Sequence, residues 1–258
     1  MSEELLFERE GALAVVTFNR PEARNAMTWA MYDGLVAACD EVDADDALRV
    51  LILRGAGGKA FVAGTDIGQF QVFRTPEDAL DYERRMDRVI ARLEMVAKPT
   101  IAAIQGVAAG GGAALALACD LRYCTPESTI GVPIARTIGN CLSMANLARL
   151  VDLLGAARAK ELLFRARLLP AEEARQAGIV NEVVPGERLE ARVREVAQEI
   201  AGHAPITLRV TKDAIRRLQL HRRPAECDDL VVQAYMSADF REGVAAFLEK
   251  RKPVFRGQ

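Results

Sequence analysis

The sequence has little of the residues that most often build metal sites and nucleophile–base pairs. Its 258 residues include only two histidines, His203 and His221, and we place both on the surface because their surroundings are charged. The cysteines are odd in number and lack CxxC spacing, so a zinc motif is excluded and a Ser-His-Asp triad is poorly supplied. We expect buried, reduced thiols, as in a cytoplasmic protein, at Cys39, Cys119, Cys124, Cys141 and Cys227.

Charge excess and long apolar runs are also missing. The chain has 34 basic and 36 acidic residues, which gives no general reason to bind nucleic acid or anionic lipid. The longest apolar stretch, Val107–Cys119, is interrupted by glycines and falls short of the roughly 20 residues that a membrane helix needs. The acidic N-terminus has no signal-peptide pattern. We therefore expect a cytoplasmic protein with no nucleic-acid partner and no membrane partner.

Small apolar residues are abundant: half of the chain is hydrophobic, yet only 5% is aromatic. Such residues suit closely packed helices and a sheet that is buried on both faces. Up to about residue 132, β-branched runs alternate with helical spacing and short glycine turns, which predicts an α/β fold with parallel strand pairing. The predicted strands are Leu13–Phe18, Val50–Leu53, Thr100–Ile104 and Leu121–Cys124, and the predicted helices are Thr28–Asp43, Glu77–Val96 and Gly110–Cys119.

The remainder of the sequence predicts mainly helices. Glycine follows several of them, at Gly155, Gly178 and Gly202, as is common at helix ends. One short strand-like segment, Ile179–Val184, interrupts them. The predicted helices are Ser143–Leu154, Ala156–Ala166, Pro170–Ala177, Glu187–Ala201, Ile206–Leu220, Ala225–Met236 and Phe240–Lys250.

Three motifs occur in a fixed order along the chain. Asn19–Ala26 reads NRPEARNA, Lys59–Ile67 reads KAFVAGTDI, and Pro99–Gly112 reads PTIAAIQGVAAGGG, followed by Cys119-Asp120. Two weaker segments, Ala171–Val180 and Gly243–Lys252, follow in the same order. Together they resemble the crotonase superfamily, the enoyl-CoA hydratase/isomerase proteins, over nearly the whole chain.

This resemblance implies a fold and an assembly. We expect an α/β, crotonase-type ββα spiral core that binds acyl-CoA in residues 1–195. Residues 196–258 would form a C-terminal helical segment for oligomerisation, in a homotrimer or a dimer of trimers.

The resemblance also implies a chemistry and a ligand. The ligand is an acyl-CoA thioester, with coenzyme A as part of the substrate, no tightly bound cofactor and no metal. The backbone N–H groups of Thr65 and Gly111 would bind the thioester oxygen as it becomes an enolate. Glycines permit the close backbone approach that such an oxyanion hole needs, and Gly110–Gly112 would open a helix toward the charge.

Contacts to the CoA moiety are expected from two loops and the C-terminal helix. Arg24 and Lys59 are the basic side chains best placed for its phosphates, although a solvated surface role fits them equally. We expect Asp66 to stabilise a turn. The resemblance places the contacts at Ala23, Arg24, Ala26, Ala63, Gly64, Asp66, Ile67, Gly68, Phe247 and Lys250.

The sequence departs from the family at the two glutamates that hydratases use. Ala114 and Ile134 stand at those positions, and neither side chain can transfer a proton. Ordinary hydratase activity is therefore doubtful. The acid/base group is not identified, and Arg136, Asn140, Ser143 and Asn146 are polar candidates for orienting substrate or water.

Cys141 offers one alternative chemistry. It stands where a dehalogenase branch of the family, which also has an Ile-Gly-Asn run, has a nucleophilic aspartate. A thiolate near a helix N-terminus would be activated, although a small apolar packing role is the favoured interpretation of Cys141. Three hypotheses follow: an enoyl-CoA hydratase/isomerase-family lyase or isomerase that stabilises an enolate, a nucleophilic acyl-CoA hydrolase or dehalogenase-like enzyme, and a non-catalytic acyl-CoA-binding subunit.

Overall fold

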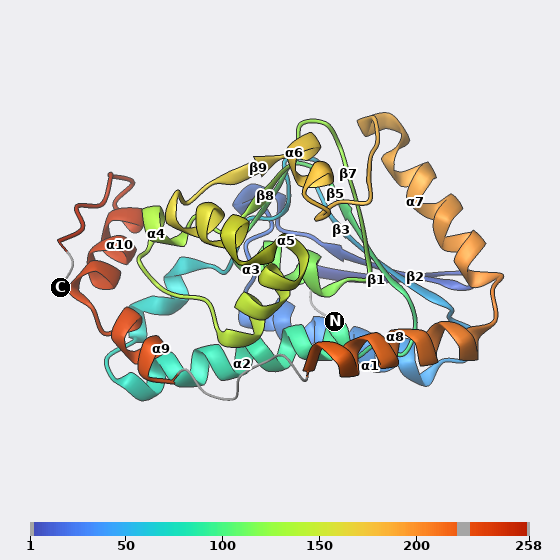
Figure 1. Ribbon diagram of the computed structural model, residues 1–258, viewed down its shortest axis with the longest axis horizontal. Helices are drawn as coiled ribbons and strands as arrows, with labels where there is room; N and C mark the ends of the chain where they lie inside the picture. Colours follow the sequence, from blue (N-terminus) through green and yellow to red (C-terminus); the bar gives the residue numbers. More distant parts are fainter. Residues whose placement is uncertain (1–2, 221–227, 257–258) are drawn as a thin grey trace.

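The computed structural model describes residues 3–220 and 228–256 and contains two sheets flanked by helices (Figure 1). The first sheet has six strands in the order β1-β2-β3-β5-β7-β10. The strand β1 is antiparallel to β2, and the other neighbours in this sheet are parallel. Its strands are β1 (Leu5–Glu10), β2 (Leu13–Phe18), β3 (Val50–Gly55), β5 (Thr100–Ile104), β7 (Leu121–Cys124) and β10 (Glu182–Val183).

The second sheet has four short strands in the order β4-β6-β8-β9. The strands β4, β6 and β8 are parallel to one another, and β9 is antiparallel to β8. None of these strands was predicted from the sequence. They are β4 (Ala60–Val62), β6 (Val107–Ala109), β8 (Thr129–Gly131) and β9 (Leu168–Pro170).

The two sheets arise from one repeated unit. Each of β3, β5 and β7 joins the six-stranded sheet, and the strand that follows it, β4, β6 or β8, joins the four-stranded sheet. A helix then leads to the next unit, which makes the ββα spiral that the sequence predicted. The helices after the three units are α2 (Pro76–Glu94), which follows the 3-10 helix η2 (Ile67–Val72), then α3 (Gly111–Ala118), and finally α4 (Ile134–Thr137) with α5 (Met144–Phe164).

Successive side chains along the strands point to opposite faces of the large sheet, and each face packs against helices. Ala14 and Val16 belong to the main core shared with α1, α2 and α3, whereas Leu13 and Val15 pack with Leu189 and its neighbours on α7. These strands are buried on both faces, as the abundance of small apolar residues predicted. The other helices of this part of the chain are α1 (Trp29–Ala44), α6 (Ala171–Gln176), α7 (Gly186–Ala201) and the 3-10 helix η1 (Pro21–Ala23).

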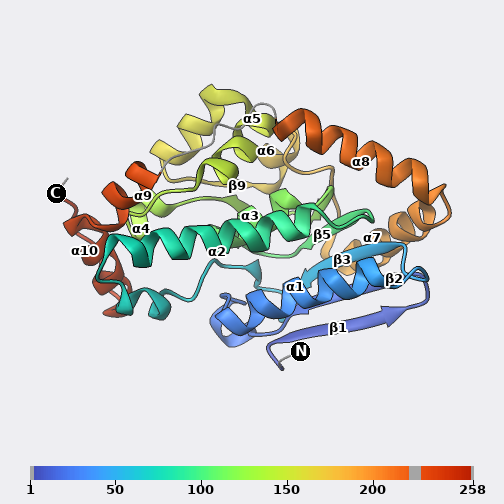
Figure 2. The same ribbon diagram turned by 90° about the horizontal axis from the view of Figure 1, so that it is seen from below.

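The C-terminal helices surround this core (Figures 1 and 2). The helix α8 (Pro205–Leu220) is tied to the core by Lys212, whose ammonium group donates to Asp120 and to the carbonyl of Lys98. The helices α9 (Asp228–Tyr235) and α10 (Ala238–Leu248) lie at the other end of the molecule, against α2 and η2. The proposed boundary at residue 195 falls inside α7.

Most predicted elements are present with shifted ends. Thr28 caps α1 by accepting a hydrogen bond from the Met31 N–H. The two helices predicted on either side of Gly155 form one element, α5, with a break at Gly155, where φ is 71°. Of the predicted strand Ile179–Val184, only β10 is formed. His221, Cys227 and the first residues of the helix predicted at Ala225–Met236 lie outside the described residues.

Candidate active site

Two glycine-containing turns bring Thr65 and Gly111 together. Gly64 and Gly110 have φ angles of 115° and 55°, which side-chain-bearing residues rarely adopt. A Cβ placed on Gly111 would lie 3.8 Å from the Thr65 nitrogen, so the two backbone segments are close neighbours. Gly111 is the first residue of α3, and its N–H is one of the groups that helix geometry leaves without an intrahelical acceptor.

The backbone on either side of Thr65 fixes the direction of its N–H. Met27 N donates to Gly64 O at 2.9 Å, and Asp66 N donates to Met27 O at 3.0 Å. These two bonds form a parallel bridge between Met27 and Thr65, in which the intervening residue's own N–H points away from the partner. The Thr65 N–H is thereby directed away from Met27.

The Thr65 side chain is held by two buried tyrosines. Its hydroxyl lies 2.8 Å from the Tyr32 hydroxyl and 3.0 Å from the Tyr82 hydroxyl. Burial raises the pKa of both phenols, so they stay protonated as hydrogen-bond donors. The network fixes the turn that carries the Thr65 amide.

The loops predicted to contact CoA lie side by side. Arg24 and Asn25 both have positive φ angles, of 51° and 57°. The buried Asn25 amide stabilises this conformation, because it accepts from Arg20 N and donates to the carbonyls of Ala56 and Ala60. Ala63 N donates to Arg24 O at 3.1 Å, which joins the loop of Ala23–Ala26 to the loop of Ala63–Gly68.

The charged residues of these loops differ in their surroundings. Arg24 and Lys59 are exposed, so both remain able to meet a phosphate. Asp66 accepts from Gly68 N at 3.0 Å and caps η2, which confirms the turn-stabilising role predicted for it. Asp66 also pairs with Arg20 at 3.2 Å. Phe247 and Lys250 are exposed at the end of α10, and α10 meets the rest of the site through Phe240, whose ring lies 5.8 Å from that of Phe70.

The two positions of the absent glutamates are apolar in the structure. Ala114 lies on α3 and lines a small cavity together with Leu142, Asn146 and Arg149. Ile134 is the first residue of α4 and is half-buried. A cavity therefore lies beside Ala114, one turn into the helix that Gly111 opens.

Two carboxylates that sequence reasoning did not single out lie on α2, and one of them, Asp87, contacts Asn146 of this cavity. Glu83 accepts a hydrogen bond from the Tyr235 hydroxyl, and Asn140 Nδ2 donates to the same hydroxyl at 3.0 Å. One turn later, Asp87 accepts from the Ser143 hydroxyl at 2.6 Å. Burial raises the pKa of Glu83 to about 7, and the nearby Asp87 charge acts in the same direction.

A sequence signal for Glu83 existed. The buried residues of α2 recur at helical spacing, and Glu83 is an acidic residue within that otherwise mostly apolar stripe. An ionisable residue at a core-facing position is expensive to bury, which makes it a functional candidate.

The residues proposed on the loop before α5 have different environments. Cys141 is half-buried and lies two residues before Ser143, which caps α5 by accepting from Asn146 N. Asn140, Ser143 and Asn146 connect to the α2 carboxylates, directly or through Tyr235, whereas Arg136 is exposed. The buried, free thiols expected at Cys39, Cys119 and Cys124 are confirmed.

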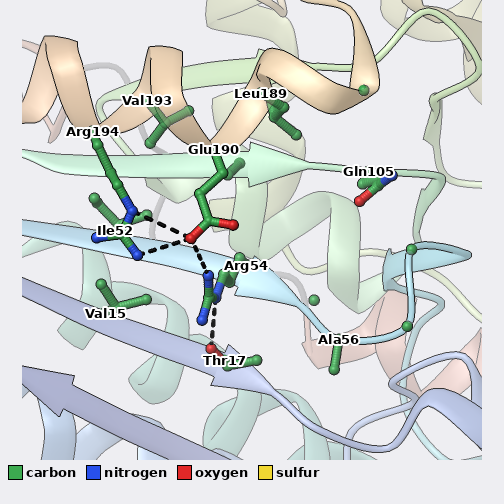
Figure 3. A pocket seen from close by; sticks show the side chains of 15 residues that line it. Val15, Thr17, Ile52, Arg54, Ala56, Gln105, Leu189, Glu190, Val193 and Arg194 are labelled. Carbon is green, nitrogen blue, oxygen red and sulfur yellow. Dashed lines mark hydrogen bonds and ion pairs between the residues drawn. The ribbon is translucent and has the colours of Figure 1, made fainter.

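A separate cavity of about 290 Å³ lies between α7 and the six-stranded sheet (Figure 3). Its floor is apolar, and its charges are paired: Arg54 and Arg194 both contact Glu190. Arg54 also donates to the Thr17 hydroxyl. Thr65 and Gly111 do not line this cavity, and its cations already have carboxylate partners, so we do not assign it to the substrate.

Within residues 3–220 and 228–256, no three His, Cys, Asp or Glu side chains gather so that they could hold a metal ion. The same part of the chain contains no helix that is long and apolar enough to cross a membrane. His203 is exposed, as predicted.

Comparison with known proteins places the chain in a family. The sequence model of the enoyl-CoA hydratase/isomerase family matches residues 8–258. A short-chain-enoyl-CoA hydratase of Clostridium acetobutylicum is 34% identical, over 96% of this chain and 95% of the relative. A 1,2-epoxyphenylacetyl-CoA isomerase of Escherichia coli is also 34% identical, with all of both chains covered.

Solved structures agree with the sequence matches. An enoyl-CoA hydratase/carnithine racemase of Magnetospirillum magneticum superimposes with a TM-score of 0.82 at 37% identity, covering 100% of this chain and 97% of the other. A methylmalonyl-CoA decarboxylase in complex with 2-nitronate-propionyl-CoA has a TM-score of 0.90 at 28% identity, with both chains fully covered. This chain belongs to the enoyl-CoA hydratase/isomerase family of the crotonase superfamily.

Proposed function

We propose that this protein binds an acyl-CoA thioester and stabilises its enolate with the backbone N–H groups of Thr65 and Gly111. The observation that carries the proposal is the close approach of these two residues, at a helix N-terminus on one side and a bridged turn on the other. Two such donors become stronger partners as the thioester oxygen gains negative charge, so they lower the barrier to enolate formation.

The overall reaction belongs to the lyase or isomerase types. Related proteins are named as hydratases and an isomerase, and a structural neighbour is named as a decarboxylase. Because Ala114 and Ile134 cannot transfer protons, we do not propose hydration by the two-glutamate route. An enolate intermediate serves each of these reaction types, and the residues around the acyl chain would decide among them.

Coenzyme A enters this proposal as part of the substrate, with no further tightly bound cofactor. Its phosphates and pyrophosphate would lie along Ala23–Ala26 and Ala63–Gly68, beside the exposed Arg24 and Lys59. Phe247 and Lys250 would contribute from α10 of the same or a neighbouring subunit. These positions agree with the family resemblance and with the loop contact between Ala63 and Arg24.

We extend the proposal to the assembly and its compartment. Residues 196–258 would form the interface of a homotrimer or a dimer of trimers. Support comes from exposed apolar side chains along α8, at Ile206, Val210, Ile215 and Leu218. The mass of the protein in solution, measured by light scattering, tests the assembly. Free thiols at Cys39, Cys119 and Cys124 fit the reducing cytoplasm.

A pair of substitutions at one residue tests the oxyanion hole. Gly111→Pro removes the N–H and adds a proline ring, which the first position of a helix tolerates. Gly111→Ala adds a comparable Cβ, which would lie 3.1 Å from the Tyr32 hydroxyl, and keeps the N–H. We expect Gly111→Pro to lower the rate of C2-proton exchange in a bound acyl-CoA by about 10²–10³-fold relative to Gly111→Ala. Equal rates in the two variants would contradict the proposal.

Cys141→Ala separates enolate chemistry from the nucleophilic alternative. Enolate stabilisation predicts that this variant retains acyl-CoA activity, because the thiol takes no part. Loss of activity with unchanged acyl-CoA binding would favour a hydrolase or dehalogenase-like reaction. Binding of many CoA thioesters with neither exchange nor turnover would favour a non-catalytic subunit.

A further inference from the structure

The family's usual proton-transfer residues are absent, yet a pair of carboxylates lies nearby on α2. Glu83 and Asp87 are four residues apart, so they project from the same face of the helix. Glu83 is only 8% exposed. The helix α2 packs on α3, the helix that Gly111 opens (Figure 2). The acidic pair thus lies on a helix that contacts the helix of Gly111.

One end of this pair connects to the oxyanion turn. Tyr82 precedes Glu83 on α2, and its hydroxyl lies 3.0 Å from the Thr65 hydroxyl. The charge of Glu83 raises the pKa of both Tyr82 and Tyr32, which is a further sign of their proximity. Tyr82 therefore anchors α2, next to Glu83, to the turn that carries the Thr65 amide.

The other end connects to the cavity beside Ala114. Asn146, whose side-chain amide lies 3.4 Å from Asp87, lines that cavity together with Ala114. Family hydratases have a glutamate at the position of Ala114, whereas this chain has a small cavity there and a carboxylate on the neighbouring helix.

An unpartnered acceptor lies beside Glu83. The Asn140 side-chain oxygen is buried and has no hydrogen-bond partner in the described part of the chain, although the amide nitrogen of the same side chain donates to Tyr235. Leaving a buried acceptor unpaired is costly. A donor from a bound ligand or an ordered water would satisfy it.

From these contacts, and resting on the enolate function proposed above, we propose that Glu83 is the acid/base residue that removes and returns the proton at C2 of the bound acyl chain. Asp87 and Tyr235 act as positioning residues. The Glu83 carboxylate accepts the proton, and the electron pair of the broken C2–H bond forms the C1–C2 double bond. The carbonyl π pair moves to the thioester oxygen, which Thr65 and Gly111 bind. Return of the proton to C2 regenerates the substrate, and its return to C4 of a conjugated enolate shifts a double bond.

The electrostatics around Glu83 suit this role. The groups that face it are Asp87 on its own helix, Tyr235 on α9, and the hydroxyls of Tyr82 and Tyr32 on α2 and α1. Burial and the Asp87 charge raise the pKa of Glu83 to about 7, while the Tyr235 hydrogen bond acts in the opposite direction. A proton carrier with a pKa near neutrality can both remove and return a proton at physiological pH.

Exchange of the C2 protons of butyryl-CoA with D2O, followed by mass spectrometry, tests the proposal without knowledge of the natural substrate. We expect Glu83→Gln to lower the exchange rate by about 10²–10⁴-fold while butyryl-CoA binding, measured by calorimetry, is retained. Glu83→Asp should recover part of the rate. Glu77→Gln is the matched control, because Glu77 is an exposed acid on the same helix, and it should exchange at the wild-type rate.

Two further variants keep the proposal testable if Glu83→Gln does not fold. Asp87→Asn removes a like charge and should move the pH midpoint of exchange down, whereas Tyr235→Phe removes a stabilising hydrogen bond and should move it up. Midpoints that do not move in either variant would overturn the assignment of Glu83.

The outcomes also separate this inference from the proposed function. Wild-type exchange in Glu83→Gln, together with slow exchange in Gly111→Pro, would overturn the role of Glu83 and leave the oxyanion hole in place. Wild-type protein that binds butyryl-CoA without exchanging its C2 protons would overturn enolate formation itself and the role of Glu83 with it.

Discussion

The contact between α3 and β4 leads to a prediction about Gly112. A Cβ placed on Gly112 would lie 2.0 Å from the Val62 carbonyl oxygen, 2.7 Å from its carbon and 2.8 Å from its Cβ. Carbon atoms normally approach such neighbours to about 3.3–4.0 Å. Gly112→Ala therefore forces α3 away from β4 by more than about 1 Å, and two of the three obstructing atoms are backbone.

Overpacking of a core costs about 1–3 kcal/mol, and the backbone obstruction places this variant near the upper end. For a chain of this size the melting temperature should fall by roughly 6–12 °C, as measured by differential scanning calorimetry. Because α3 carries Gly111, the C2-proton exchange rate should fall as well.

Gly186→Ala is the matched control for Gly112→Ala. Gly186 also lies in the first turn of a helix, but its added Cβ would meet neighbours only at 3.8–3.9 Å. We expect its melting temperature to be unchanged or slightly higher, since alanine favours the helix. If the two variants melt at the same temperature, the close approach of α3 to β4 does not constrain the helix as argued.

Three further predictions concern chemistry, loop structure and pH. Wild-type protein should hydrate crotonyl-CoA at least about 10²-fold more slowly than a two-glutamate hydratase assayed beside it; comparable turnover would show that the missing glutamates do not matter. Asn25→Ala should lower the free energy of unfolding by about 2–4 kcal/mol in urea titrations, because it removes three hydrogen bonds that are buried or partly buried; an unchanged midpoint would contradict this. Folding raises the pKa of Glu83 from 4.5 to about 7, so its charged form is disfavoured in the folded state. The free energy of unfolding of the wild-type protein should therefore fall by about 3 kcal/mol, relative to that of Glu83→Gln, as the pH rises from 4.5 to 7. A difference that is constant across this pH range would refute the sign.

The long elements of the fold could be predicted from local patterns. The β-branched run of β2 and the apolar stripe of α2 each extend far enough for periodicity to be read. The strands β4, β6, β8 and β9 have three residues each, too few for any period to show. The strand β1 was missed because charged residues occupy its exposed positions.

Some residues of the candidate site could likewise be predicted from the sequence, and others could not. Thr65 and Gly111 lie in motifs whose glycines mark the turns, so their positions could be named from sequence. Glu83 could not be assigned in this way, because its partner Tyr235, and Asn140, which donates to the same hydroxyl, lie 152 and 57 residues away along the chain. Only the folding of α9 against α2 shows that this acid is buried beside an amide of the loop before α5.

The ββα repeat has a consequence for the spacing of the two amide donors. Thr65 follows β4 and Gly111 follows β6, so the donors occupy equivalent places in successive turns of the spiral. The strands β4 and β6 are neighbours in one sheet, so they lie about 4.8 Å apart. This strand spacing suits two N–H groups that converge on one oxygen atom. In the next turn, β8 is followed by Val132 and then Pro133, which has no N–H to offer. The width of the proposed oxyanion hole would thus be set by strand pairing, and the side chains around the acyl group could change without altering it.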